Sequence, residues 1–183
     1  MDLLPTFLKL SGRRVLVVGA GPVALSKLEG LTRTGAHITV VAPAVHPSIP
    51  RPGLRIERRA FAPADLDGVW YVVAAATADV NAAVAREAER RQVFVNAVDD
   101  PANASAYLGG VVRRADVTIA ISTGGSAPAL AGVLREAVDA LLPDDLDRWS
   151  ACARELRRTW KQDGIPMGAR RPQLIDALKG LYP

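Results

Sequence analysis

Two adjacent carboxylates stand where an apolar run ends. In "VFVNAVDDP", residues 93–101, Asp99 and Asp100 follow a strand-like segment and precede Pro101. A carboxylate at the end of a buried strand is suited to accept a proton as a general base. Asp-Pro is also a common turn signal, so the pair could serve only to shape the turn. Taken alone, these residues leave both interpretations of Asp99 open.

A glycine-rich loop, "GAGPVA", follows another apolar run, "RRVLVV". Its pattern is G-x-G-x-x-A, in which Gly19 permits a tight turn, Gly21 lets the backbone approach a pyrophosphate, and Ala24 lets the helix pack close to the strand. The start of the helix adds unpaired N–H groups and the positive end of its dipole. Because the loop joins a strand to a helix and a second strand follows, we predict a dinucleotide-binding site.

The second strand ends without the acidic residue that usually binds the ribose hydroxyls of a dinucleotide. The stretch "VVAPAVHP", residues 40–47, contains no Asp or Glu, so backbone groups around residues 42–44 would have to hold the ribose. This absence leaves NAD and NADP both open. His46 and Arg51 could face a 2′-phosphate, although a surface role suits both.

Strand-like runs alternate with helical patterns over the first hundred residues. We predict strands within residues 13–21, 37–43, 54–61, 68–77 and 93–100, and helices within residues 22–36 and 78–92. Such alternation is typical of an α/β fold with a Rossmann-like parallel sheet and helices on both faces. The carboxyl ends of the strands should then lie along one edge, where open α/β sheets bind ligands.

The pattern changes after residue 105. We predict two antiparallel strands within residues 106–123, followed by a turn and helix within residues 124–142 with Ser126 as N-cap. We predict further helices within residues 144–160 and 171–181. We therefore expect an NAD-binding domain over residues 1–106, a strand-helix segment over residues 107–143, and a helical C-terminal region over residues 144–183.

Composition excludes several classes of protein. Hydrophobic residues make up 49% of the 183, which is typical of a folded protein. Cys152 is the only cysteine and there are two histidines, so we predict no internal disulfide and no metal site. No apolar run is long enough to span a bilayer, and the first residues lack the features of a signal peptide, so we expect a cytoplasmic protein without membrane contact.

The net charge of +4 lies in the C-terminal region, where residues 146–183 hold eight basic and four acidic side chains. This excess suits an acidic partner, or simply a solvated helix face. No helix-turn-helix pattern or aromatic platform accompanies it, so we expect no nucleic-acid partner.

Three segments in order resemble the precorrin-2 dehydrogenase family, which includes the N-terminal part of multifunctional siroheme synthase. They are residues 4–43, "VNAVDDP" at residues 95–101, and "IAISTGGSAPALAGVLREAVDALLP" at residues 119–143. The resemblance implies NAD-dependent oxidation of precorrin-2, an anionic tetrapyrrole, to sirohydrochlorin in siroheme and cobalamin biosynthesis. It also implies a homodimer formed through the middle segment.

The resemblance further implies roles for individual residues. The family's key aspartate falls on Asp99, which favours Asp100 as a turn former. The family's cofactor contacts fall on five positions: Gly21, Pro22, Val23, Pro43 and Ala44. The chain departs from the family at "YLGG", residues 107–110, where members often carry F-x-x-P.

Binding a substrate with many carboxylates requires cations and N–H groups. The candidates are Arg113 and Arg114, the turn from Thr123 to Ser126, and the C-terminal cluster Arg154, Arg157 and Arg158. These could equally be a hairpin tip, a structural cap and a solvated helix face. Two other functions stay open from the sequence. The protein could also insert iron into sirohydrochlorin, or it could be a dinucleotide-sensing module without catalysis.

Overall fold

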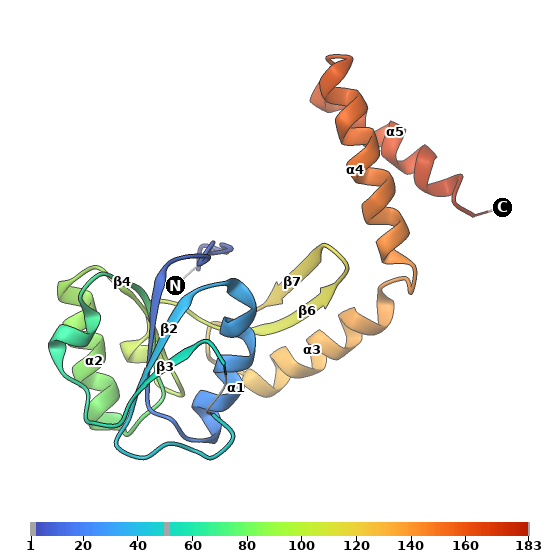
Figure 1. Ribbon diagram of the computed structural model, residues 1–183. Helices are drawn as coiled ribbons and strands as arrows, with labels where there is room; N and C mark the ends of the chain where they lie inside the picture. The colour runs from blue at the N-terminus through green and yellow to red at the C-terminus, as the bar shows by residue number, and fades with distance from the viewer. Residues whose placement is uncertain (1–2, 50–51, 183) are drawn as a thin grey trace. The chain divides into compact units, whose positions relative to one another are not determined.

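The computed structural model describes residues 3–49 and 52–182. The chain separates into two compact units, Met1–Leu108 and Gly109–Pro183, drawn in Figure 1 from blue to red along the sequence. The domain limits expected from the sequence, at residues 106 and 143, stay predictions.

The first unit is built on a parallel sheet of five strands. These are β1 (Arg14–Val18), β2 (His37–Val41), β3 (Leu54–Glu57), β4 (Val69–Ala74) and β5 (Phe94–Ala97). They lie in the order β3-β2-β1-β4-β5, with every neighbouring pair parallel. The predicted α/β fold is therefore confirmed, and the strand order reverses direction between β1 and β4, which is where such sheets bind ligands.

Two helices cover the two faces of this sheet, as Figure 1 shows. Helix α1 (Pro22–Leu31) buries Ala24 and Leu28 against one face, in a core that includes Val15, Val17 and Val40. Helix α2 (Ala78–Arg90) buries Val84 and Ala88 against the other face, with Leu16, Val18 and Val72. The alternation of side chains along β1 thus supplies both cores, which is why its sequence is apolar at nearly every position.

Helix α1 is shorter than the sequence predicts. The α-helix ends at Leu31, and a 3₁₀ turn over Thr32–Thr34 leads to Gly35, whose φ of 70° is left-handed. The Thr34 hydroxyl donates to the Leu31 carbonyl at 2.6 Å. This side-chain bond takes one of the carbonyls at the end of the helix and favours the tighter turn.

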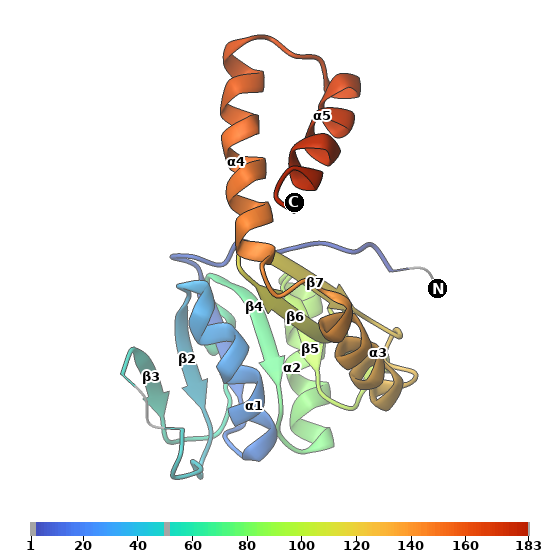
Figure 2. The same ribbon diagram turned by 90° about the vertical axis from the view of Figure 1, so that its right-hand side faces the viewer.

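The second unit begins with an antiparallel ribbon of β6 (Gly110–Arg114) and β7 (Val117–Ile121), as predicted. Helix α3 (Pro128–Leu141) packs on one face of the ribbon, and Figure 2 shows the two side by side. Contact is close because Gly110 has no side chain: a Cβ there would lie 2.9 Å from the Ala131 carbonyl oxygen.

Two details of this unit differ from the sequence prediction. The N-cap of α3 is Ala127 and not Ser126, and the Ser126 hydroxyl donates to the Thr123 carbonyl at 2.5 Å instead of accepting from the helix. Helix α4 (Leu146–Gln162) is followed by α5 (Met167–Lys179), which begins four residues before the predicted start at Arg171. Pro172, the second residue of the predicted helix, therefore lies inside α5.

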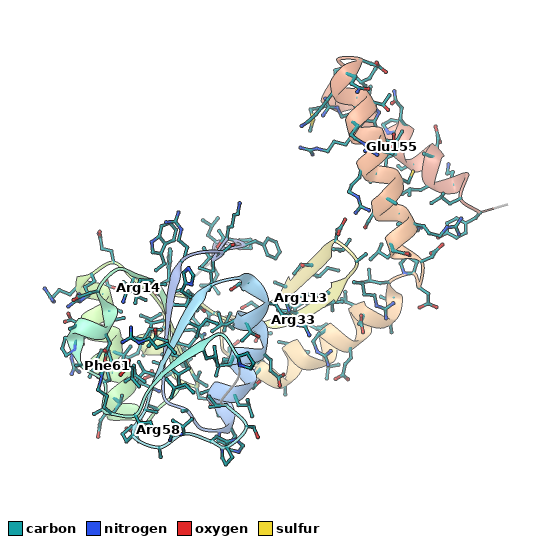
Figure 3. The ribbon with its side chains drawn as sticks, in the orientation of Figure 1. Arg14, Arg33, Arg58, Phe61, Arg113 and Glu155 are labelled. Carbon is teal, nitrogen blue, oxygen red and sulfur yellow. The ribbon has the colours of Figure 1, made fainter. Side chains whose placement is uncertain are left out.

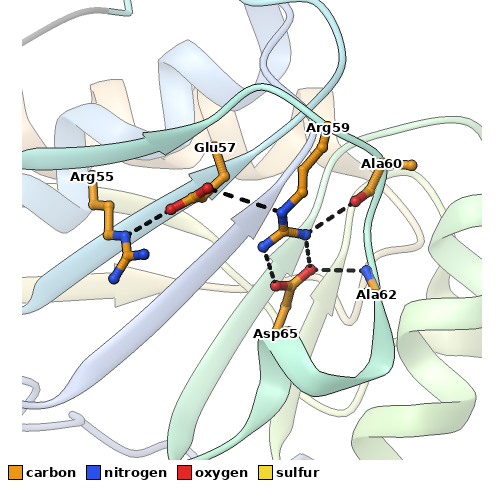
Figure 4. Close-up of polar contacts among 6 residues, drawn as sticks. All are labelled: Arg55, Glu57, Arg59, Ala60, Ala62 and Asp65. Carbon is orange, nitrogen blue, oxygen red and sulfur yellow. Dashed lines mark hydrogen bonds and ion pairs between the residues drawn. The ribbon is translucent and has the colours of Figure 1, made fainter.

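A small ionic cluster fixes the chain after β3, as Figure 4 shows. The Arg59 guanidinium donates to both carboxylate oxygens of Asp65, at 2.8 and 2.6 Å. The Ala62 N–H donates to the same carboxylate at 2.8 Å. Hydrogen bonding from Arg59, and then from Ala62, holds the pKa of Asp65 below its usual range.

Acid should weaken the fold through this carboxylate. Because the folded pKa lies below the unfolded one, the stabilisation is complete at neutral pH and is lost as the pH falls through the folded pKa. We expect Asp65→Asn to cost about 1 kcal/mol at neutral pH, since Arg59 is half exposed to water. Urea unfolding from about pH 7 to about pH 3 should show a shallower loss of stability in the variant. Asp176→Asn, at an exposed acid of α5, is the control, and equal slopes for all three proteins would contradict this role.

Candidate functional site

Gly19 is the point where the loop after β1 meets the turn after β4. Its φ is 100°, and a Cβ at this position would lie 2.1 Å from the Ala75 carbonyl oxygen. Its N–H donates to the Val41 carbonyl at 2.9 Å, and the Ala75 N–H donates to the Val18 carbonyl at 2.8 Å. Only glycine combines this backbone conformation with this approach, so Gly19 joins three strands at the edge where the strand order reverses.

Gly21 is a glycine for a different reason. It is the N-cap of α1, its φ of −86° suits any residue, and a Cβ there would meet nothing within 4 Å. The packing of the chain therefore gives no reason for a glycine, whereas the approach of a ligand to the backbone would. This open space is where the loop pattern predicts a pyrophosphate.

The start of α1 also supplies hydrogen-bond donors. The first helical bond runs from the Leu25 N–H to the Gly21 carbonyl at 3.0 Å, so the N–H groups before Leu25 have no partner within the helix. Pro22 has none, which leaves those of Gly21, Val23 and Ala24. Free donors, a missing side chain and the helix dipole together fit a phosphate group.

The loop after β2 lies against the glycine loop. The His46 N–H donates to the Ala20 carbonyl at 2.9 Å, while Val45 and Ile49 pack into the core below. Pro43 and Ala44, the two cofactor positions implied by the resemblance, are exposed. Arg51 lies outside the described residues.

The structure distinguishes the two adjacent carboxylates after β5. Asp100 accepts a hydrogen bond from the Asn103 amide at 2.6 Å, and its carbonyl accepts one from the Asn103 N–H at 3.2 Å. The side chain of Asp99 is exposed, with no hydrogen bond or ion pair to any residue of 3–49 or 52–182. Asp99 also has a φ of 55°, a left-handed conformation that Asp and Asn tolerate better than other side chains. Asp100 shapes the turn, and Asp99 remains available for chemistry.

Two buried amides position this edge of the sheet, and sequence reasoning missed both. Asn81 of α2 accepts from the Ala76 N–H at 3.0 Å and so fixes the turn that Gly19 approaches. Asn96 of β5 donates to the Ala106 carbonyl at 3.0 Å and ties the chain beyond Asp99 back to the strand, while its amide oxygen is buried without a partner among the described residues. The sequence offered one signal for them: each is an amide side chain among apolar residues, in a strand or on the buried face of a helix. A buried amide of this kind is expected to make hydrogen bonds that support the local structure.

The two candidate arginines of the second unit differ in their surroundings. Arg114 donates to Asp139 of α3 at 2.9 Å and to the Leu142 carbonyl at 3.4 Å, so its guanidinium holds the ribbon to the helix. Arg113, labelled in Figure 3, is exposed opposite Thr118. It has no hydrogen bond or ion pair within the described parts of the chain. Of the two, Arg113 is the cation free to meet an anion.

The turn before α3 carries the candidate hydroxyls. The Ser126 hydroxyl donates to the Thr123 carbonyl at 2.5 Å, and the Thr123 hydroxyl accepts from Ala127. Gly124 and Gly125 between them have φ values of 63° and 79°. Both hydroxyls therefore support the turn. The N–H groups of Gly124 and Ser126 donate within it, to the Ser122 hydroxyl and the Thr123 carbonyl, both at 3.1 Å. The Gly125 N–H has no partner among the described residues and is the donor of this turn suited to an anion.

The described residues contain neither a membrane-spanning helix nor a cluster of metal ligands. No helix in the ranges 3–49 and 52–182 is long and apolar enough to cross a membrane. Within the same ranges, no three side chains of His, Cys, Asp or Glu gather as metal ligands.

A family model described as "Putative NAD(P)-binding" matches residues 6–110 of the chain. Siroheme synthase of Methylobacillus flagellatus is 41% identical over 167 residues, which is 88% of this chain and 36% of that protein. Siroheme synthase 1 of Cronobacter sakazakii is 43% identical over an alignment of 187 residues that covers 100% of this chain and 40% of that protein. The chain thus spans less than half the length of these relatives.

One solved structure is similar to this chain over most of the length of both proteins. It is "SirC, precorrin-2 dehydrogenase", which superposes with a TM-score of 0.75 and 26% sequence identity. The superposition covers 95% of this chain and 88% of that chain. The similarity therefore extends through both units and is not limited to the glycine loop.

The two glycines of the loop should respond differently to the same substitution. Gly19→Ala should cost more than about 3 kcal/mol of unfolding free energy, because the new methyl group would overlap the Ala75 carbonyl. Gly21→Ala should cost about 1 kcal/mol or less, from the lower N-cap preference of alanine. It should nevertheless weaken NAD binding at least about tenfold, because the methyl group occupies the space left for the pyrophosphate.

Urea unfolding and calorimetric titration with NAD would measure both effects. Wild-type affinity for NAD in folded Gly21→Ala would show that this loop does not hold the pyrophosphate.

Proposed function

Because the chain belongs to this NAD(P)-binding family, we propose that it is an NAD-dependent oxidoreductase that converts precorrin-2 to sirohydrochlorin in siroheme and cobalamin biosynthesis. The names of the similar proteins and the three-segment resemblance support this substrate. The observation that carries the proposal is the free Asp99 carboxylate, which follows β5 at the same sheet edge as the loop of Gly21. The proposal keeps the cytoplasmic location that the sequence predicted.

The glycine loop would bind the cofactor. The N–H groups of Gly21, Val23 and Ala24 would hold the pyrophosphate, and the exposed Pro43 and Ala44 would border the ribose. When bound, NAD supplies the hydride acceptor of the reaction. The chain's own task is then to orient the substrate and to remove a proton.

Asp99 would remove that proton. Oxidation of precorrin-2 removes two hydrogens: a hydride from carbon to the cofactor, and a proton that a base must accept as the new double bond forms. The Asp99 carboxylate has no competing partner within the described chain, so it is free to act as this general base. Its proton can pass to water, because the side chain is exposed.

The second unit, taken by itself, carries candidate groups for binding the substrate's carboxylate side chains. Arg113 and the Gly125 N–H, in the turn Thr123–Ser126, fit this role, with the Thr123 and Ser126 hydroxyls stabilising the turn. Arg114 would contribute indirectly, since its guanidinium is engaged with Asp139.

Substitutions of Asp99 and Asp100 test the proposal, because the first would remove the general base and the second would alter only the turn. Asp99→Asn keeps the size and the tolerance for a positive φ but cannot accept the proton, so kcat should fall at least about a hundredfold. Asp100→Asn keeps an acceptor for Asn103 and should retain kcat within about threefold. NADH formation from precorrin-2 under anaerobic conditions would measure both, with the Kd for NAD as a control that should change in neither variant.

The reverse pattern, in which Asp100→Asn abolishes turnover and Asp99→Asn does not, would assign the base to Asp100. Wild-type protein that binds NAD but forms no NADH from precorrin-2 would reject the oxidoreductase itself.

We further propose that the second unit forms a homodimer with a second copy of the chain. Leu130, Val133, Leu134 and Leu141 are exposed along one stripe of α3, and Val133 is 62% exposed. Within the described residues the ribbon has only two strands, so both of its outer edges lack a strand partner. A two-stranded ribbon is marginal by itself. A second copy of the chain would cover the apolar stripe with its own α3 and could pair one edge of its ribbon with the same edge of this one.

A charge on the stripe should disrupt this dimer. Val133→Asp would place a carboxylate in the buried interface, and we expect the monomer to become the main species in light scattering after size exclusion. Ile175→Asp, at an exposed aliphatic residue of α5, is the matched control and should remain dimeric. A monomeric wild type, or a dimeric Val133→Asp variant, would contradict the proposal.

A further inference from the structure

The loop after β2 holds a histidine beside the glycine loop. Ile49 is completely buried and Val45 packs against the same core, so the chain between them cannot move freely. Within this span, the His46 N–H donates to the carbonyl of Ala20, the residue between the two loop glycines. The backbone of His46 is therefore fixed next to the backbone that would receive the dinucleotide.

The imidazole of His46 is also oriented. Its Nδ1 accepts a hydrogen bond from the Ser48 N–H at 3.3 Å. A ring nitrogen that accepts carries no proton, so the neutral ring has its proton on Nε2. That Nε2–H has no acceptor among residues 3–49 and 52–182, and the side chain is only half buried. The loop thus presents the Nε2–H of His46 as a hydrogen-bond donor without a partner among the described residues.

A dinucleotide site of this fold needs a polar group at this position. The carboxylate that usually binds the adenosine ribose is absent, since residues 40–49 contain neither Asp nor Glu. Pro43 and Ala44 have no polar side-chain atoms. A ribose hydroxyl can accept a hydrogen bond as well as donate one, so a donor can replace the missing acid.

We propose that the Nε2–H of His46 donates a hydrogen bond to a hydroxyl of the adenosine ribose of NAD. His46 is then the residue whose side chain recognises this ribose. The inference rests on the proposed function, because it assumes that NAD binds at the glycine loop. It assigns to a side chain the contact that the sequence alone left to the backbone.

Removing the donor should weaken NAD binding in a way that depends on the ribose. We expect His46→Ala to raise the Kd for NAD about five- to tenfold, the effect of one neutral hydrogen bond. His46→Gln retains an N–H donor on a side chain of similar reach and should recover most of the affinity. His37→Ala, at the exposed histidine that opens β2, and Ser48→Ala, which keeps the N–H that orients the ring, should bind NAD as the wild type does.

Analogues of NAD that lack the 2′- or the 3′-hydroxyl of the adenosine ribose complete the test. The wild type should bind one of them about five- to tenfold more weakly than NAD, and His46→Ala should show no such preference. An equal loss of affinity for NAD and both analogues in His46→Ala would mean that the loop had moved, and would overturn the inference. Unchanged NAD affinity in His46→Ala would overturn it as well.

The measurements distinguish failure of this inference from failure of the proposed function. The wild type could bind NAD while His46→Ala loses the same affinity for NAD as for both analogues. In that case only this inference is wrong. If the wild type does not bind NAD, the proposed function fails together with it.

Discussion

The edge of the sheet where we propose that NAD binds depends on one close backbone contact, that between Gly19 and the turn after β4. A single methyl group at residue 19 would lie 2.1 Å from the Ala75 carbonyl oxygen, so the contact excludes every side chain. It lies where the strand order reverses, between β1 and β4. Asn81 holds the opposite side of the contact through the Ala76 N–H. The direction of α1, and with it the position of its free N–H groups, follows from this junction.

The same edge shows how neighbouring residues of one type acquire different roles. Asp99 and Asp100 are adjacent carboxylates, but Asn103 engages one and leaves the other exposed. Arg113 and Arg114 repeat the pattern in the second unit, since alternation along β6 directs one toward α3 and the other away from it. In each pair the engaged member stabilises local structure, and the free member can meet a ligand.

Much of this arrangement could be predicted from the sequence because it is local. The apolar runs mark all five parallel strands, and the G-x-G-x-x-A pattern marks the turn and helix start at Gly19 and Gly21. The strand order depends on pairing between distant segments and could not be read from periodicity. Ser126 does not cap α3 because its hydroxyl donates to the Thr123 carbonyl in the folded turn, a contact that the sequence does not reveal. The start of α5 at Met167 has no side-chain cap that could have marked it in the sequence.

The contributions of buried polar groups were the hardest to foresee. Asn81 and Asn96 act through single bonds to the backbone of other segments, which exist only once the sheet has formed. The state of His46 likewise depends on the folded path of residues 46–48. Such groups could be noticed in the sequence as polar residues in apolar surroundings, but their partners could not be named.

A crystal structure of the protein with NAD and sirohydrochlorin would test the central claim most directly. We predict the pyrophosphate at the N–H groups of residues 21–24, and the Asp99 carboxylate directed at the macrocycle beside the nicotinamide ring. A complex in which Asp99 points into solvent, away from both ligands, would contradict the account.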